Sequence, residues 1–357
     1  MSLKNQTIFL TGFPGFIAGR LVKRLAIEGT RFILLVQPVF SEKACEEVKK
    51  ISDDCGLDVN SFQIIQGDIT QQNFGISPLD YERAKEETTT IFHLAAVYDL
   101  AVTRPIAMRV NVEGTRSVNE FALGVKNLRR YHYISTCYVA GMRTGLIKED
   151  ELKHNEGFRN FYEETKYLAE LEVEALKTQI PITIHRPSVV CGDSKTGETA
   201  KYDGIYYVIH YLRKWPGFLS LFNIGNAHVR LNLVPVDFVV DGMTALAKDE
   251  RAVGATVQLA DPAPLTTEQI CNTIGKALSG KESLLTIPAP LVQRSLMLPF
   301  SPPITGLPHS GVPYFFLQQI YDTTLAQQLL EPNGVRCPSF PSYVEALISF
   351  VEKNPKL

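Results

Sequence analysis

The sequence lacks the features that mark several classes of protein. It has no basic excess, with 36 Lys and Arg against 38 Asp and Glu, so a broad surface for nucleic acid is not expected. Its six cysteines lie far apart without a Cys-x-x-Cys pair, and no His pair has metal spacing, which argues against disulfides and zinc. No apolar run approaches the roughly 18 residues of a membrane span. The polar N-terminus shows no signal peptide. We expect a cytoplasmic protein with no metal, no nucleic-acid partner and no transmembrane segment.

The first half of the chain alternates short apolar runs with longer helical patterns. With 357 residues, 45% of them hydrophobic, the chain is long enough for two domains with a sizeable core. The apolar runs are continuous, as in strands that are buried on both faces of a sheet. Strands are predicted at residues 7–11, 32–36, 62–65, 90–94, 131–135 and 182–185, and helices at residues 16–28, 42–51, 79–87, 105–123 and 160–178. This order predicts an α/β fold with a doubly wound parallel sheet of the Rossmann type.

The second half differs in composition. Residues 202–222 are rich in aromatic side chains, and seven prolines between residues 287 and 314 exclude a long regular element there. Between these segments, a predicted helix at 234–248 and a predicted strand at 256–260 return to the first domain. The expected division is a first domain of residues 1–190 joined by 233–260, and a smaller interleaved C-terminal domain of residues 191–232 and 261–357.

A glycine-containing loop, TGFPGFIA at residues 11–18, joins the first strand to the first helix. Gly12 allows the tight turn, Gly15 lets a pyrophosphate approach the backbone, and the small Ala18 lets the helix pack closely on the strand. The helix N-terminus offers free N–H groups to the anion, and a strand-to-helix junction is the context that this motif requires. The first domain is therefore predicted to bind a dinucleotide and the second to bind the substrate. The predicted loop contacts are Thr11, Gly12, Phe13, Pro14, Gly15, Phe16 and Ile17.

Residues at the ends of the next strands extend the predicted cofactor site. Asp68 could accept a hydrogen bond from the adenine amino group and Ile69 could cover the ring, although an ordinary turn Asp is the alternative. His93 is predicted to pack or to form hydrogen bonds rather than to catalyse. Gln37 ends the second strand, where an acidic residue would select NAD and an arginine NADP, so the choice stays open. The small residues that let the ribose and phosphate lie against the fourth strand are Ala95 and Ala96.

Tyr162 and Lys166 stand four residues apart, on one face of a predicted helix. An ammonium group near the phenol, helped by a positive nicotinamide ring, would lower the tyrosine pKa from about 10. Tyr162 would then be a competent general acid toward a carbonyl that receives hydride. A second hydroxyl at the end of the fifth strand, from Ser135 or Thr136, would orient that carbonyl. The same spacing at residues 81–85 precedes the fourth strand, so it predicts only an exposed charged helix.

Taken together, the motifs resemble the extended short-chain dehydrogenases over nearly the whole chain. The best match within them is the fatty acyl-CoA reductase and thioester-reductase branch, with its male sterility type of NAD-binding domain. The segments that carry the resemblance are TGFPGFIA at 11–18, FHLAAVYDL at 92–100, NVEGT at 111–115, ISTCYVAG at 134–141, YEETK at 162–166, HRPSVVCGDSKTGE at 185–198 and NLVPVDFVVDG at 232–242.

The resemblance implies roles for individual residues. It makes Thr136, in preference to Ser135, the hydroxyl that helps to hold the carbonyl oxygen. It makes Tyr162 the proton donor and Lys166 the residue that binds the nicotinamide ribose, so both also contact the cofactor. Asn111 resembles the asparagine that steadies the active-site backbone and a water molecule. The segment implied to line the nicotinamide side is Pro187, Ser188 and Val189.

The resemblance also implies an activity, which is NAD(P)H-dependent reduction of a fatty acyl thioester to an aldehyde or an alcohol. The thioester would arrive on coenzyme A or on a separate acyl carrier protein. NADP(H) is favoured, but family members that use NADPH usually carry Arg where this chain has Gln37, so NAD(H) stays possible. The 202–222 and 287–314 segments could form the acyl-binding wall or simply the core and loops of the second domain.

Three other functions compete with this one. A ketone, aldehyde or hydroxysteroid dehydrogenase would use the same hydroxyl, tyrosine and lysine. A sugar-nucleotide epimerase or dehydratase shares the fold, but commonly has an acidic residue where Gln37 stands. A non-enzymatic dinucleotide sensor typically lacks the Tyr-x-x-x-Lys pair that this chain has at residues 162–166.

Overall fold

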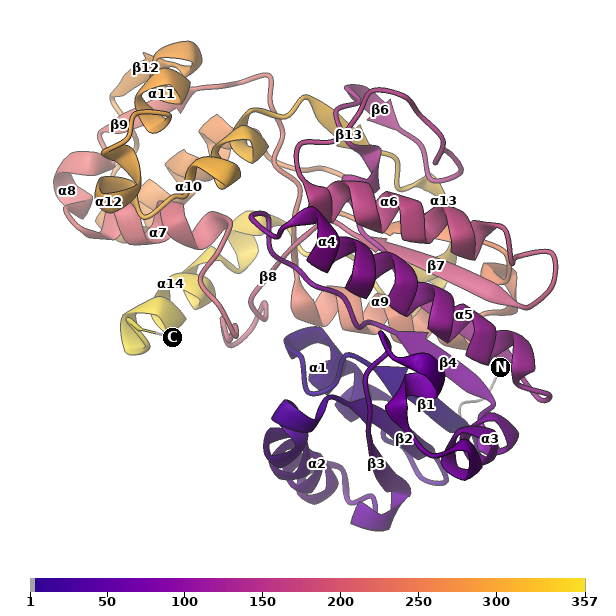
Figure 1. Ribbon diagram of the computed structural model, residues 1–357. Helices are drawn as coiled ribbons and strands as arrows, with labels where there is room; N and C mark the ends of the chain where they lie inside the picture. Colours follow the sequence, from indigo (N-terminus) through magenta and orange to yellow (C-terminus); the bar gives the residue numbers. More distant parts are fainter. Residues whose placement is uncertain (1–3, 357) are drawn as a thin grey trace.

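The computed structural model describes residues 4–356 and has a seven-stranded parallel sheet at its centre (Figure 1). Across the sheet the order is β3-β2-β1-β4-β5-β7-β11. Its strands are β1 (Thr7–Thr11), β2 (Arg31–Val36), β3 (Phe62–Gln66), β4 (Thr90–His93), β5 (Arg130–Ile134), β7 (Ile182–Pro187) and β11 (Thr256–Leu259). The order reverses between β1 and β4, which creates the crevice where doubly wound sheets bind ligands. The predicted fold class is confirmed.

Helices cover both faces of the sheet because its strands are apolar on both sides. In β1, Ile8 and Leu10 pack into one core, whereas Phe9 packs into the other. The helices on the first face are α1 (Phe16–Leu25), α2 (Ser41–Cys55) and α9 (Val236–Lys248). Those on the second face are α3 (Pro78–Glu87), α5 (Gly114–Gly124) and α6 (Phe161–Glu174), and α5 and α6 cross the sheet side by side in Figure 1.

The single helix predicted at residues 105–123 is interrupted. It consists of α4 (Arg104–Ala107), a π-helical segment η4 (Met108–Glu113) and then α5. A π-helical segment often lies at a functional site, and this one carries Asn111. Periodicity could not predict it, because the apolar residues still recur at helical spacing.

A second lobe packs around its own apolar core. That core takes residues from α7 (Ile205–Arg213), α10 (Thr267–Ser279), the 3₁₀ segment η7 (His309–Phe316) and α14 (Val344–Lys353). Its smaller pairings are β8 (Val189–Cys191) with β10 (Leu233–Pro235), and β9 (Phe222–Gly225) with β12 (Leu285–Pro288). The proline-rich stretch forms only the short helices α11 (Ala289–Leu296) and α12 (Ser301–Thr305) before η7, as the prolines predict.

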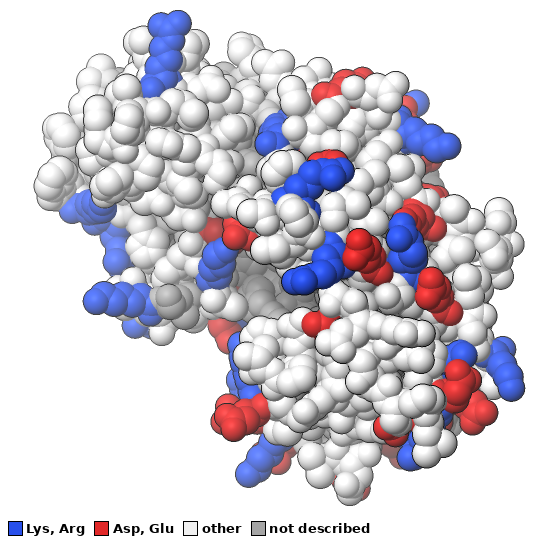
Figure 2. Space-filling view, in the orientation of Figure 1, with Lys and Arg blue, Asp and Glu red and all other residues white. Residues whose placement is uncertain are grey.

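The surface of the second lobe is poor in charge. Figure 2 shows few charged side chains over α11, α12 and α8 (Pro216–Leu219), whereas acidic and basic groups are spread over the first lobe. Large apolar side chains lie at this surface, among them Trp215, which is 69% exposed, and Phe300, which is 60% exposed. These side chains therefore do not line an interior wall.

The chain returns to the first lobe twice. In the first return β11 pairs with β7 and α9 packs against α1. In the second, β13 (Gln319–Tyr321) pairs with β6 (Gly145–Ile147), and α13 (Thr324–Leu330) packs on α9 and β11. The sequence-based division does not include the second return, which depends on the burial of Ala326, Leu329 and Leu330 against the sheet.

Residues 4–356 contain neither a membrane-spanning helix nor a cluster of metal ligands. None of the helices in this range has both the length and the apolar character to cross a membrane. Within the same range, no three His, Cys, Asp or Glu side chains are grouped so that they could hold a metal ion.

Candidate active site

The predicted phosphate loop lies between β1 and α1. Gly12 has a φ of +91°, and a Cβ there would lie 2.8 Å from the backbone nitrogen of Ala95, so this position requires glycine. The exposed Gly15 is the N-cap of α1, and the first turn has no acidic residue and no side-chain cap. The first N–H groups and the positive end of the helix dipole are therefore available to an anion. This arrangement fits the pyrophosphate of a dinucleotide.

The predicted loop contacts differ in exposure. The Phe13 side chain is 3% exposed and packs in the core behind the sheet, so only its backbone could face a cofactor. Pro14, Phe16 and Ile17 are half-buried. The Arg20 guanidinium lies 5.0 Å from the centroid of the Phe16 ring, which places one cation beside the loop.

At the far end of the predicted cofactor site, Gln37 lies beside a carboxylate. Its Nε2 donates to Asp68 Oδ2 at 3.0 Å. Ile69 is 6% exposed and packs close to Gly114, so its side chain is a core residue more than an open platform for a base. Ala96 is exposed at the end of β4. Any cofactor phosphate near Gln37 would thus experience the negative charge of Asp68.

A buried chain of hydrogen bonds joins the phosphate loop to Lys166. Thr11 Oγ1 lies 2.7 Å from His93 Nδ1, and His93 Nε2 lies 3.0 Å from Thr115 Oγ1. The Thr115 hydroxyl is hydrogen-bonded to Tyr133, whose Oη accepts from Lys166 Nζ at 3.0 Å. Burial, and to a lesser degree the charge of Lys166, lowers the pKa of His93 to about 3, so the ring is neutral. His93 therefore links β1, β4 and α5 structurally.

Helix α6 carries Tyr162 and Lys166, and the end of β5 brings Thr136 to Tyr162. Tyr162 is 7% exposed and Lys166 is 3% exposed. The hydroxyls of Thr136 and Tyr162 are hydrogen-bonded. Ser135 instead donates to Glu170 on the same helix. Of the two candidate hydroxyls, Thr136 is therefore the one that meets the phenol.

The pKa values of Tyr162 and Lys166 are set mainly by burial. Burial raises the pKa of Tyr162 above its usual value of about 10 and outweighs the hydrogen bond with Thr136, which lowers it. The lowering expected from the Lys166 ammonium is not found. The Lys166 ammonium turns toward β5, where it donates to the Ile134 carbonyl at 2.7 Å. Burial lowers the pKa of Lys166 to about 7, and the charge of Glu170 partly opposes this effect. A phenol that stays protonated at neutral pH is suited to donate a proton.

Asn111 connects the loop after β4 to α6. Its Oδ1 accepts from the backbone nitrogen of Val97 at 2.8 Å, and its Nδ2 donates to Thr165 Oγ1 at 3.0 Å. The π-helical turn directs this side chain between the two elements. Asn111 thus ties the loop after β4 to the helix that carries Tyr162.

The segment at residues 187–189 leaves the sheet at the end of β7 and enters β8. The Ser188 side chain donates to Asn232 Oδ1 at 2.7 Å, and its backbone nitrogen donates to the Leu259 carbonyl at 3.1 Å. Pro187 is buried and Val189 is half-buried. Val189 also lines the cavity between the lobes.

That cavity, which we call the inner pocket, encloses about 110 Å³. Tyr98 lines it and packs edge-to-face on Tyr162, with ring centroids 5.2 Å apart. Only the beginning of the aromatic segment and the end of the proline-rich stretch reach it. The lining residues from these two segments are Asp203, Gly204, Ile205, Tyr207, Leu307, Pro308, Ser310, Gly311 and Tyr314. Phe315 follows directly, and Asp99 and Lys201 add charged groups to the lining.

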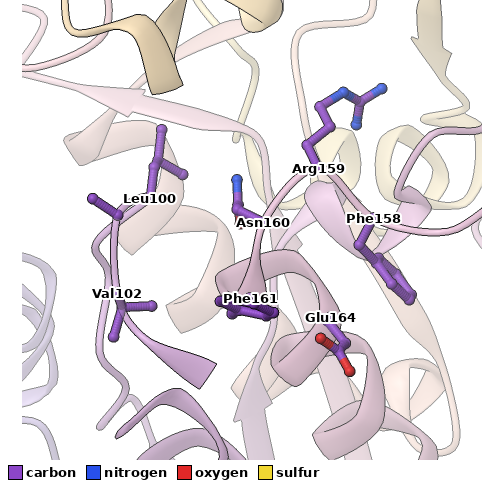
Figure 3. Close-up of a pocket in the computed structure, with 8 residues that line it drawn as sticks. Leu100, Val102, Phe158, Arg159, Asn160, Phe161 and Glu164 are labelled. Carbon is purple, nitrogen blue, oxygen red and sulfur yellow. The ribbon is translucent and has the colours of Figure 1, made fainter. Parts of the chain in front are cut away.

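A second cavity, which we call the outer groove, has a volume of about 400 Å³ (Figure 3). In Figure 3 Leu100 and Val102 face Phe161 across it. Leu100 lines both cavities. Glu164 lies on the groove and pairs with Arg104 at 2.8 Å. Leu100 is thus common to the two cavities, and Phe161, the residue before Tyr162, lines the outer groove.

The segment 287–314, a possible acyl-binding wall in the sequence analysis, ends at Tyr314, but the sequence does not single this residue out. Its Oη donates to the buried Glu163 at 2.5 Å and accepts from Asn160 Nδ2 at 2.7 Å. Its ring packs on that of Tyr138, with centroids 4.6 Å apart. These contacts fasten η7 of the second lobe to the start of α6. No local pattern connects Glu163 with a partner 151 residues away.

Comparison with known proteins agrees with this geometry. The family model described as male sterility protein matches residues 10–243. The chain belongs to this family of NAD-binding proteins. The match confirms the resemblance found in the motifs and places the chain among oxidoreductases of the extended short-chain dehydrogenase type.

Two curated relatives illustrate the family. The chain is 25% identical to the fatty acyl-CoA reductase wat of Drosophila melanogaster over 289 residues. This alignment covers 70% of the chain and 55% of that protein. The chain is 24% identical over 268 residues to a linear gramicidin synthase polypeptide of Brevibacillus parabrevis, covering 72% of the chain and 5% of that polypeptide. The chain thus spans about half the length of the fatty acyl-CoA reductase.

Solved structures share the fold. The terminal R domain of the myxalamid PKS-NRPS pathway has a TM-score of 0.82 at 24% identity, over 99% of this chain and 92% of that one. UDP-glucuronic acid 4-epimerase from Bacillus cereus, in complex with NAD, has a TM-score of 0.68 at 17% identity, over 98% of this chain and 100% of that one.

Proposed function

We propose that this chain is an NAD(P)H-dependent reductase of acyl thioesters, most favourably fatty acyl thioesters, and that NADPH is the preferred cofactor. The observation that carries the proposal is the hydrogen-bonded pair of hydroxyls from Thr136 and Tyr162, buried beside a largely apolar pocket between two lobes. The names of the relatives support the thioester, since one is a fatty acyl-CoA reductase and one solved neighbour is a thiolation-reductase di-domain.

The proposed cofactor site follows the crevice at the carboxyl ends of β1 and β4. The bound nicotinamide would supply the hydride. Lys166 would bind its ribose, and the N-terminus of α1 would bind the pyrophosphate. The other residues proposed to hold the dinucleotide are Thr11, Gly12, Phe13, Pro14, Gly15, Phe16, Ile17, Gln37, Asp68, Ile69, Ala95, Ala96, Pro187, Ser188 and Val189.

In the proposed reaction Thr136 and Tyr162 hold the carbonyl oxygen of the thioester. As hydride adds to the carbonyl carbon, negative charge develops on that oxygen, and Tyr162 transfers its proton to it. The carbon–sulfur bond then breaks and the hydroxyl proton passes to the departing thiolate, which gives an aldehyde and a free thiol. Asn111 positions α6 during these steps. A second hydride addition would convert the aldehyde to an alcohol.

We propose that the substrate lobe comprises residues 191–232 and 261–357. The acyl chain would enter the inner pocket, and the thiol would belong to coenzyme A or to a separate acyl carrier protein. The helix α13 packs on the first lobe, so within this division it acts as a brace and does not contact substrate.

The test measures NAD(P)H oxidation and free thiol together, against acyl-CoAs of graded length, a loaded acyl carrier protein, aldehydes, ketones and a hydroxysteroid. We expect oxidation with thioesters, with one thiol released for each one or two cofactors consumed. Reduction of ketones or hydroxysteroids without thiol release from any thioester would contradict the proposal and favour a dehydrogenase.

A further inference from the structure

We infer that the end of the second lobe is a docking surface for a lipid bilayer that carries anionic headgroups. This surface, which we call the apolar tip, is formed by residues 214–225 and 283–305, and it includes α8, β9, β12, α11 and α12 (Figure 1). The inference goes beyond the proposed reaction and does not depend on it.

The apolar tip exposes large apolar side chains from several of its elements. Leu284, just before β12, is 78% exposed, and Trp215, just before α8, is 69% exposed. Phe218 on α8, Leu291 on α11 and Phe300 before α12 are each more than half exposed. Single apolar side chains at a surface are ordinary, but a continuous apolar surface of more than roughly a few hundred Å² marks an interaction site.

The two segments of the tip lie against each other, so these side chains are not scattered. Strand β9 pairs with β12, and α11 packs on both β9 and α12. The backbone nitrogen of Leu284 donates to the Leu221 carbonyl at 3.0 Å, and Lys214 Nζ donates to the Ile304 carbonyl at 2.6 Å. The exposed apolar side chains therefore gather at one end of the molecule.

Two elements of the tip bury little of their own apolar surface. All four residues of β12 are exposed, and α11 has no fully buried residue although it contains Leu291, Val292 and Leu296. A helix at the surface of a globular protein normally turns its apolar side chains toward a core. A second apolar phase would remove from water the area that the core of this lobe does not cover.

The charges of the tip decide which partner fits it. The chain has no Asp or Glu between residues 204 and 236 or between residues 283 and 321, whereas Lys214 and Arg294 are exposed cations. Figure 2 shows only basic groups among the few charged side chains over α8, α11 and α12. A symmetric contact with a second copy would bring two cationic surfaces together without a carboxylate. An anionic bilayer instead accepts the apolar side chains and attracts the cations.

Trp215 strengthens this assignment and also allows a direct test. It is the only tryptophan of the chain, and it lies on the tip. Tryptophan favours the boundary between headgroups and hydrocarbon, because its ring is apolar while its N–H still finds a hydrogen-bond acceptor. The fluorescence of an indole shifts to shorter wavelength when the ring leaves water, so Trp215 reports contact of the tip with lipid.

The experiment titrates the intact protein with unilamellar vesicles and follows the emission of Trp215, with co-sedimentation as an independent measurement. One set of vesicles contains phosphatidylcholine alone, and the other contains equal parts of phosphatidylcholine and phosphatidylglycerol. We expect the emission to shift to shorter wavelength and the protein to sediment with the anionic vesicles. Binding to the neutral vesicles should be weaker, and added salt should weaken binding to the anionic ones.

Variants with matched controls locate the contact. Leu284→Ser and Leu291→Ser should each weaken binding to the anionic vesicles by about tenfold, because each removes an apolar side chain that the bilayer would cover. Leu79→Ser in α3 is the control and should have no effect, since Leu79 and Leu284 are both 78% exposed. Circular dichroism checks that each variant keeps the fold.

A second pair of variants tests the charge. Arg294→Gln should weaken binding to the anionic vesicles by about fivefold and leave binding to the neutral vesicles unchanged. Arg31→Gln is the control, because Arg31 is exposed at the start of β2 in the first lobe.

Four outcomes would overturn the inference. The first is that neither kind of vesicle binds the protein, which would leave the tip to a protein partner. The second is unchanged affinity in both leucine variants of the tip, and the third is equal affinity for neutral and anionic vesicles. The fourth is a dimer that forms without lipid and that Leu284→Ser dissociates in analytical ultracentrifugation, which would assign the tip to a second copy. The assay contains neither substrate nor cofactor, so its result is independent of the proposed function.

Discussion

At the scale of single residues, the Tyr162 hydroxyl is held by Thr136 in a buried site that keeps it protonated. Tyr162→Phe removes the proposed proton donor, but it removes no charged group that would bind the cofactor. We expect the rate to fall by about 10²–10⁴-fold with dinucleotide affinity unchanged, measured by steady-state kinetics and titration. Tyr81→Phe is the control, since Tyr81 packs against Phe74 and Phe121 far along the sheet. Full turnover in Tyr162→Phe would remove the basis of the proposed mechanism.

Tyr133 is a positioning residue for Lys166, because its hydroxyl accepts a hydrogen bond from the ammonium group. This bond favours the charged lysine, whose pKa burial has lowered to about 7. Tyr133→Phe removes the bond and lowers that pKa further. If the ammonium form is the active one, the loss of kcat/KM at high pH should begin about one pH unit lower. If Tyr133 had a purely structural role, the substitution would lower kcat/KM at all pH values and would not change the pH at which kcat/KM begins to fall.

Cofactor choice depends on Gln37 and its neighbour. Gln37 neither repels a 2′-phosphate nor pairs with it, and Asp68 beside it opposes one. The family resemblance favours NADPH while these two residues do not, so we expect NADPH to be preferred over NADH by less than about a hundredfold, or about 2.7 kcal/mol. Gln37→Arg should raise the preference, and Gln37→Asp should reverse it, as judged by kcat/KM for both cofactors. A strict NADH preference in the unmodified protein would refute this and favour a dehydrogenase or an epimerase.

At the scale of elements, α1 is the one that would hold the pyrophosphate. A Cβ at Gly15 would lie 2.7 Å from the Gly12 carbonyl oxygen, so a side chain there would distort the loop as well as block the anion. Gly15→Val should abolish dinucleotide binding while circular dichroism shows the fold retained. Gly217→Val is the matched control, because a Cβ at Gly217 would meet nothing within 4 Å. Unchanged affinity in Gly15→Val would place the cofactor elsewhere.

The interrupted helix α4–η4–α5 shows how one element can position two others. Its π-helical turn carries Asn111, whose side chain joins Val97 to Thr165 and so links the loop after β4 to α6. The same loop carries Tyr98 and Leu100, which line the cavities. The loop that lines the cavities is therefore linked to α6 through the Asn111 amide, as it is through the packing of Tyr98 on Tyr162.

At the scale of the whole molecule, Glu149 ties the C-terminal return to the sheet. Its carboxylate accepts from the backbone of Gln258 in β11 at 2.8 Å and of Leu325 in α13 at 2.7 Å. Burial raises its pKa from 4.5 to about 7, although these hydrogen bonds oppose the shift. The folded protein thus binds this proton more tightly than the unfolded chain. The stability that Glu149 contributes is present below pH 4.5 and is lost as the pH rises to about 7.

Glu149→Gln tests this linkage, because the amide cannot ionise. Between about pH 5 and pH 8, the free energy of unfolding of the unmodified protein should fall relative to that of the variant. The decrease should be less than about 3 kcal/mol, because solvent partly screens the site. Chemical denaturation at several pH values measures it, with the exposed Glu46→Gln as control. If the unmodified protein instead became more stable relative to Glu149→Gln as the pH rises, the predicted direction would be wrong.

The sequence by itself determined the central sheet and the order of the catalytic set. Continuous apolar runs require burial on both faces, glycines at residues 12 and 15 leave α1 open to an anion, and a Tyr-x-x-x-Lys spacing puts both side chains on one helix face. These are local properties, readable from neighbouring residues.

Only the tertiary structure decided the rest, because it depends on residues far apart in the chain. The Ser135 hydroxyl donates to Glu170, so Thr136 is the hydroxyl that contacts Tyr162. Burial outweighs the hydrogen bond with Thr136 and raises the pKa of Tyr162, which no spacing predicts. Tyr314 reaches Glu163 across 151 residues to close the inner pocket. Desolvation and long-range contacts arise only when the chain is folded, so they set the chemistry of a site that the sequence could merely outline.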